Sequence, residues 1–189
     1  MKIKKFNENF EKATQATQEL LTAISNKDLE NVKKAIKNGA DLNYRNPRNV
    51  SNTPLISAIY SACDYNIAKE LIDAGADLNI GDLHDVTPLM CTIIKSKIEM
   101  FDYLLKSKTI DLDKKTDGKK TALILAAGGY GRATTTERNY MIKKLIDAGA
   151  DMFIQNQAGD FYDNAAEKEI KEFIEKEYPE FIAAKKYNL

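Results

Sequence analysis

The side chains best suited to chemistry surround the single histidine of the chain. In Asp82-Leu83-His84-Asp85 an imidazole lies between two carboxylates, a combination that could supply a general base or a metal ligand. Either task needs further converging groups, and no nucleophile motif or second histidine accompanies His84. We therefore interpret this segment as a surface connector that is available for contact with a partner.

Two other motifs also resemble chemical sites. Gly128-Gly129-Tyr130-Gly131 could be mistaken for a phosphate cradle, but it lacks the Gly-Lys-Ser/Thr ending and the preceding strand of a phosphate-binding loop. Cys63 and Cys91 have no Cys-x-x-Cys partner, so buried reduced thiols are expected rather than zinc ligands or a disulfide. We expect no catalytic residue, no metal and no cofactor.

Lysines are concentrated at one place, where Lys114-Lys115 and Lys119-Lys120 bracket Asp117-Gly118. Across the chain, however, 28 Lys and Arg balance 28 Asp and Glu, and this balance argues against nucleic acid as a partner. The basic pairs could still orient an acidic protein partner. No apolar stretch approaches the ~20 residues of a membrane span, so the sequence predicts a cytoplasmic protein with no membrane partner. We also expect a monomer.

Two short sequence phrases recur along the chain with nearly constant spacing. An aspartate followed by an apolar residue returns after 36, 34 and 40 residues, at Asp41, Asp77, Asp111 and Asp151. A helix-starting phrase returns twice after 34 residues, in Thr53-Pro54-Leu55, Thr87-Pro88-Leu89 and Thr121-Ala122-Leu123. Thr caps a helix, Pro suits its first turn, and the Gly before three of the aspartates suits its end. Each unit is therefore predicted to be two short helices followed by an extended connector.

These phrases resemble the ankyrin-repeat family, whose unit of about 33 residues opens with a Thr-Pro-Leu-His-x-Ala type motif. The resemblance covers residues 18–166, although Ile56, Met90 and Ile124 replace the usual histidine. It implies an all-α ankyrin-repeat solenoid of helix-turn-helix units with short β-hairpin fingers. We expect one domain over 1–189, divided into a leading helix (1–17), four repeats (18–51, 52–85, 86–119 and 120–159) and a C-terminal cap (160–189).

Repeat four departs from the pattern, because Thr121 and Asp151 are 30 residues apart where the two preceding repeats have 24. The six extra residues are predicted to lie in an inter-helix loop over 128–139, with 129–138 as the most mobile internal segment. The first finger is also longer, by two residues.

The resemblance further implies a protein-protein interaction module that binds an unidentified protein through its concave face and fingers, and no enzyme. The residues expected to contact the partner lie in the fingers, at the ends of the first helices and in the repeat-four loop: Tyr44, Arg45, Arg48, Asn49, Asn52, Tyr60, Ser61, Leu83, His84, Val86, Ile94, Lys95, Lys119, Lys120, Gly128 and Tyr130. Two alternatives stay open: a small-molecule or enzymatic site at the repeat-four insertion, and a self-associating structural protein.

Overall fold

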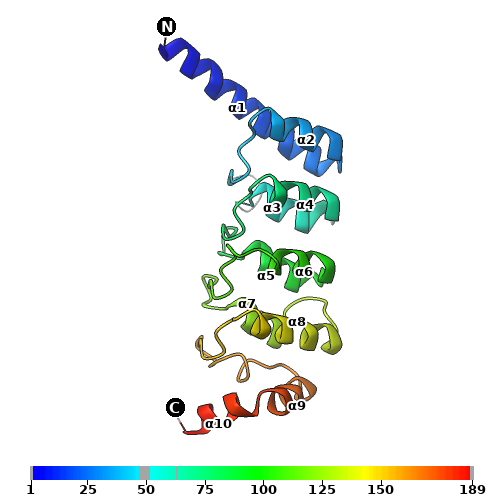
Figure 1. Ribbon diagram of the computed structural model, residues 1–189, viewed down its shortest axis with the longest axis vertical. Coiled ribbons are helices and arrows are strands. Elements are labelled where there is room, and N and C mark those ends of the chain that lie inside the picture. Colours follow the sequence, from blue (N-terminus) through cyan, green and yellow to red (C-terminus); the bar gives the residue numbers. More distant parts are fainter. Residues whose placement is uncertain (1, 47–51, 63, 188–189) are drawn as a thin grey trace. The chain divides into compact units, whose positions relative to one another are not determined.

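A computed structural model describes the backbone of residues 2–46, 52–62 and 64–187, and the side chains of 14–46, 52–60 and 64–187 (Figure 1). The chain forms two compact units, residues 1–88 and 89–189, which are described separately below. In both units the described residues form helices and connectors, with no strand longer than an isolated bridge. The expected all-α fold class is confirmed.

Unit 1 contains two helix pairs. The first pair is α1 (Lys2–Ser25) with α2 (Leu29–Lys37), and the second is α3 (Pro54–Ser57) with α4 (Tyr65–Asp73). Each pair packs internally, and α2 also contacts α4, so the pairs form successive layers (Figure 1). α1 is much longer than the other helices because the expected leading helix runs directly into repeat one.

The first helix of repeat two differs from the expectation of one regular helix. It starts as expected, because the Thr53 hydroxyl accepts a hydrogen bond from the backbone N–H of Ile56 and Pro54 follows in the first turn. After Ser57 the backbone widens into a π-helical turn, η1 (Ala58–Ala62). The sequence carries no local signal that predicts this change.

Unit 2 contains the remaining helices. They are α5 (Pro88–Lys95, whose first residue closes unit 1), α6 (Ile98–Leu105), α7 (Ala122–Ala127), α8 (Thr135–Asp147), α9 (Lys168–Glu177) and α10 (Pro179–Tyr187). α8 packs against α7, α6 and α9, and α10 packs against α9. Buried Ile170 and Ile174 of α9 cover the end of this unit, as expected for a cap.

Glycine ends the second helix in three of the repeats. Gly39, Gly75 and Gly149 have φ angles of 86°, 94° and 98°, in the left-handed region that side chains with a Cβ seldom adopt. In each case the residue after the glycine donates its N–H to a carbonyl in the last turn of the helix, as in Ala76 to Leu71. The predicted helix stop is confirmed at these positions.

Backbone hydrogen bonds close the connectors without forming strands. The bonds run from Asn46 N–H to Asn52, from Asp82 to Val86, from Thr116 to Lys120 and from Asn156 to Gly159. Each connector therefore turns back like a hairpin, but the ladder is too short to count as a strand. We call the two central connectors finger two (residues 79–86) and finger three (residues 113–120).

Candidate binding surfaces

Four of the residues predicted to contact a partner are linked by contacts in unit 2, and a fifth, Lys95, follows one of them in the chain. We call Ile94, Lys95, Lys120, Gly128 and Tyr130 the Tyr130 surface. The ammonium of Lys120 lies 3.9 Å from the centre of the Tyr130 ring, a cation-π contact between finger three and the repeat-four loop. The ring lies so close to Gly128 that a Cβ there would overlap it, and Gly131 lies equally close to the Ile94 carbonyl. The loop thus joins the end of α5 to finger three.

Glycine and a helix cap fix the backbone of this loop. Gly129 and Gly131 have φ angles of 69° and 111°, and a Cβ at either position would also meet neighbouring atoms. At the far end, Thr134 caps α8, where its backbone N–H donates to the Glu137 carboxylate at 2.7 Å and its hydroxyl accepts from Glu137 N–H. The hydrogen bond from Thr134 N–H is the main cause that lowers the pKa of Glu137.

The interpretation of residues 128–139 as a single inter-helix loop is wrong in its second half. α8 begins at Thr135, and Arg138 is only 5% exposed. The extra residues of repeat four therefore lengthen the second helix as well as the loop. A deletion of six consecutive residues within 129–138 would therefore remove part of α8 or its cap residue, Thr134.

An ion pair between a buried arginine and a partly exposed glutamate lies beneath the loop, and no sequence pattern predicts it. The guanidinium of Arg138 pairs with the carboxylate of Glu167, which also accepts a hydrogen bond from the Thr135 hydroxyl at 2.5 Å. Next to it, Ala166 N–H donates to the carbonyl of Ala127 at 3.1 Å, and Gly129 lies against the guanidinium. The Thr135 hydroxyl, followed by Arg138, lowers the pKa of Glu167. These contacts tie both ends of the repeat-four loop to the C-terminal cap.

Finger three presents lysines on a rigid turn. Thr116 N–H donates to the Lys120 carbonyl at 3.0 Å, and the Thr116 hydroxyl accepts from Lys120 N–H at 3.1 Å. Lys119 has a left-handed φ of 57° and an exposed side chain, whereas Lys120 is half-buried. The two predicted contact residues of this finger therefore differ: Lys119 faces solvent and Lys120 lies over Tyr130.

Finger two is the corresponding feature of unit 1. The buried carboxylate of Asp82 accepts the N–H groups of His84 at 2.8 Å and Val86 at 3.0 Å, which holds the turn from inside. This arrangement leaves the Leu83 side chain 62% exposed and His84 exposed, while Val86 is half-buried. In the part of the chain with described side chains, no three His, Cys, Asp or Glu residues are grouped as metal ligands would be.

Arg45 braces finger two. Its Nη2 donates to the Gly81 carbonyl at 2.8 Å and lies 3.8 Å from the Asp85 carboxylate. Tyr44 beside it is half-buried. The guanidinium that was expected to meet a partner is thus already engaged with the neighbouring finger.

The other predicted contact residues of unit 1 belong to the first connector and to the first helix of repeat two. Asn52 is buried, and its carbonyl accepts from Asn46 N–H at 3.1 Å. Tyr60 is half-buried within η1. Arg48 and Asn49 lie outside the described residues, as does the side chain of Ser61.

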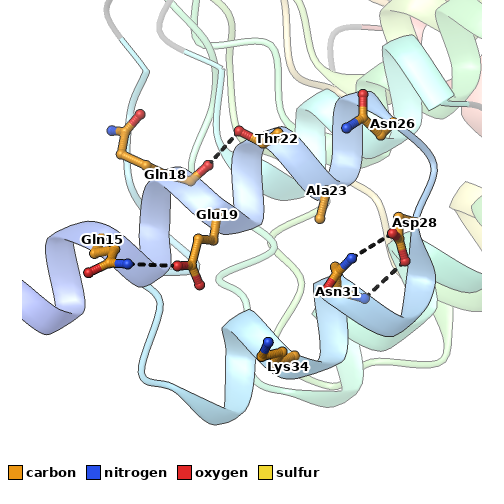
Figure 2. Close-up of a pocket in the computed structure, with 9 residues that line it drawn as sticks. All are labelled: Gln15, Gln18, Glu19, Thr22, Ala23, Asn26, Asp28, Asn31 and Lys34. Carbon is orange, nitrogen blue, oxygen red and sulfur yellow. Dashed lines mark hydrogen bonds between the residues drawn. The ribbon is translucent and has the colours of Figure 1, made fainter.

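A polar hollow of about 420 Å³ lies between α1 and α2 (Figure 2). The polar groups in it bond to one another: Gln15 donates to the Glu19 carboxylate at 2.9 Å, and Asn31 donates to Asp28 through both its backbone and its side-chain N–H. The backbone bond from Asn31 is the main cause that lowers the pKa of Asp28. This face has the polar character of the outer side of a terminal repeat, and its carboxylates already have partners.

Comparison with known proteins decides the family. A sequence profile described as ankyrin repeats (3 copies) matches residues 61–156, just over half of the chain. The chain belongs to the ankyrin-repeat family. Similar proteins include neurogenic locus notch homolog protein 1 of Cricetulus griseus, 36% identical over 117 residues, and that of Xenopus tropicalis, 29% identical over 124 residues. Human neurogenic locus notch homolog protein 2 is 34% identical over 114 residues.

The similarity to these relatives is confined to the repeats. The matches cover 62%, 66% and 60% of this chain but only 4%, 5% and 4% of the respective relatives. No helix in the described part of this ankyrin-repeat chain is long and apolar enough to span a membrane. Ankyrin repeats in general mediate protein-protein interaction, and that general role is what the family assigns to this chain.

Proposed function

We propose that this ankyrin-repeat protein binds a protein partner through its fingers, the ends of its first helices and the repeat-four loop. The observation that carries the proposal is the Tyr130 surface, where a partly exposed aromatic ring lies under a lysine and the loop that carries the ring packs on the backbone of Ile94. Such preformed surfaces lower the ordering cost of association. Tyr is also among the residue types that dominate binding energy at interfaces.

The second helices have a different character, which supports the assignment to the finger side. Their exposed lysines pair with acids in the same helix: Lys33 with Glu30, Lys69 with Asp73 and Lys143 with Asp147. Surfaces of solvated lysine and glutamate are unlike the core of an interface, where these residue types are depleted. This side serves solubility in our proposal.

The cellular location is part of the same proposal. Cys91 is buried and forms no disulfide in the described part of the chain, as is usual for cysteines in the reducing cytoplasm. We place the protein there as a binding module without catalytic activity. The partners and activities of the Notch homologues are not transferred, since the match covers so little of those proteins.

Affinity capture from the native source, quantified by mass spectrometry, tests the proposal with two alanine sets. Leu83→Ala, Lys119→Ala and Tyr130→Ala together alter the finger side, and Lys33→Ala, Lys69→Ala and Lys143→Ala alter the second helices. We expect the first set to reduce recovery of the partner at least tenfold and the second to leave it within twofold. If recovery of the partner fell only with the second set, the interface would lie on the second helices.

A further inference from the structure

We propose that the partner presents an acidic segment with an apolar or aromatic side chain to the Tyr130 surface and finger three. The inference rests on the function proposed above and specifies the chemistry of the partner. It is drawn from the charges and contacts of unit 2 alone.

Cations predominate in the segments that meet at this surface. Residues 113–120 contain four lysines against two aspartates, and Lys95 and Arg132 add to them from the end of α5 and from the loop. The side chains of Lys115, Lys119 and Arg132 are exposed, and no carboxylate in the described part of the chain forms an ion pair with them. These three cations are free to meet a carboxylate supplied by a partner.

Two acids near these cations accept hydrogen bonds from backbone N–H groups. The Asp113 carboxylate accepts Asp151 N–H at 2.9 Å, and the Glu137 carboxylate accepts Thr134 N–H at 2.7 Å. Those bonds fix the positions of both acids, but each acid keeps its negative charge. The four lysines of finger three with Lys95 and Arg132 still outnumber Asp113, Asp117 and Glu137 by six to three, so a local excess of positive charge remains although the chain as a whole has a formal charge of zero.

The apolar part of the surface favours a protein over a nucleic acid. Tyr130 is 39% exposed, and one face of its ring is occupied by Lys120 while Gly128 lies against its edge carbons. Ile94 at the end of α5 is half-buried and contacts the loop. A ring engaged in this way leaves less stacking area for a base, whereas an apolar side chain can pack beside it. Charge complementarity around such an anchor would give orientation and a fast encounter.

A display library of random twelve-residue peptides, selected against the full chain, supplies the probes. Binding of the selected peptides is then measured by fluorescence anisotropy in 50 mM and 500 mM NaCl. Three proteins are compared with the wild type: a charge reversal (Lys115→Glu, Lys119→Glu, Arg132→Glu), Tyr130→Ala, and a control reversal on other exposed lysines of unit 2 (Lys108→Glu, Lys143→Glu, Lys176→Glu). Circular dichroism and Tm establish that each variant is folded.

The inference predicts selected peptides with net negative charge and at least one large apolar residue. Their binding should weaken at least tenfold in the charge reversal and at high salt, weaken in Tyr130→Ala, and stay within twofold in the control. Selection of neutral or basic peptides whose binding depends on Tyr130 would contradict the proposal of an acidic partner but not the proposed binding function. Peptides whose binding depends on neither Tyr130 nor the three reversed cations would contradict both the acidic partner and the proposed binding surface. Tighter binding of a twenty-nucleotide single-stranded DNA, lost on charge reversal, would overturn the inference in favour of nucleic acid.

Discussion

Gly75 is the clearest case of a residue required by backbone conformation alone. Its φ is 94°, yet a Cβ built there would have no heavy atom within 4 Å, so strain and not crowding opposes a larger residue. Gly75→Val should lower the free energy of unfolding by about 1–3 kcal/mol, which urea denaturation would measure. Gly118→Val is the matched control, because Gly118 has an ordinary φ and its nearest such atom is 3.7 Å away. Equal losses in the two variants would contradict the helix-stop assignment.

Tyr178 in the C-terminal cap carries a buried hydroxyl with no hydrogen-bond partner in the described structure. Burial, followed by the nearby Asp147 and Glu177, raises the pKa of Tyr178 from 10.0 to about 12. A raised folded-state pKa contributes stability below pH 10 that is lost as the pH rises from 10 to 12, because only the unfolded phenol ionises there.

Replacing this hydroxyl should reduce the alkaline sensitivity of the fold. Between pH 8 and pH 11, Tyr178→Phe should lose less unfolding free energy than the wild type, as measured by urea denaturation at both pH values. The ring contact with Phe173, at 6.3 Å between centres, is retained by the substitution. Tyr187→Phe removes an exposed hydroxyl and is the control. An identical pH response in the wild type and Tyr178→Phe would show that the Tyr178 phenol titrates normally.

At the scale of elements, helix starts and stops were predictable because their signals are local. Thr53 and Thr121 cap their helices as the repeated phrase indicates, and Gly39, Gly75 and Gly149 end them. The start of α8 also has a local signal that the prediction missed. Thr134 and Glu137 form a capping box three residues apart, but the threonine-rich run around them was interpreted as loop.

The candidate site was less predictable, since its geometry depends on contacts distant in sequence. Family positions and the loop composition selected Lys120 and Tyr130 separately, but nothing local predicts that one lies over the other. Arg138 and Glu167 are 29 residues apart on different elements, so neither periodicity nor spacing reveals their ion pair. Arg45 was chosen for its residue type, and its bond to Gly81 crosses 36 residues.

The Glu167 carboxylate should act as a link between α8 and the cap. Glu167→Ala leaves the buried guanidinium of Arg138 without its counter-charge and should lower Tm by several degrees at pH 7. Because the pKa of Glu167 is lowered in the fold, its contribution is present above the ordinary carboxyl pKa of 4.5 and is lost as the pH falls below it. The difference in Tm between variant and wild type should therefore shrink in acid.

Glu172→Ala is the matched control for this link. Glu172 lies on α9 and pairs with Lys168 at 2.9 Å, but both side chains are exposed. Little change in Tm is expected, because exposed ion pairs contribute little. If Glu172→Ala and Glu167→Ala had equal effects, the ion pair between Arg138 and Glu167 would have no special role in holding the loop.

At the scale of the whole molecule, each of the two units carries fingers and second helices that differ in chemistry. Finger two presents Leu83 on a turn held by Asp82, and unit 2 presents Tyr130 on a loop held by glycines and a helix cap. Lys33, Lys69 and Lys143 of the second helices pair with acids of their own helices. Since each repeat contacts its neighbours only, stability is spread along the chain and surface residues can vary without loss of the fold.

Site-specific photo-crosslinking in the native cell shows directly whether a partner protein binds to the fingers or to the second helices. p-Benzoylphenylalanine is placed at Leu83, Lys119 or Tyr130 on the finger side, or at Lys33, Lys69 or Lys143 on the second helices, and crosslinked proteins are identified by mass spectrometry. If the partner binds to the fingers and the repeat-four loop, one set of proteins is crosslinked from the finger-side positions and is absent from the second-helix positions. Crosslinks to a common protein from the second-helix positions alone would contradict it.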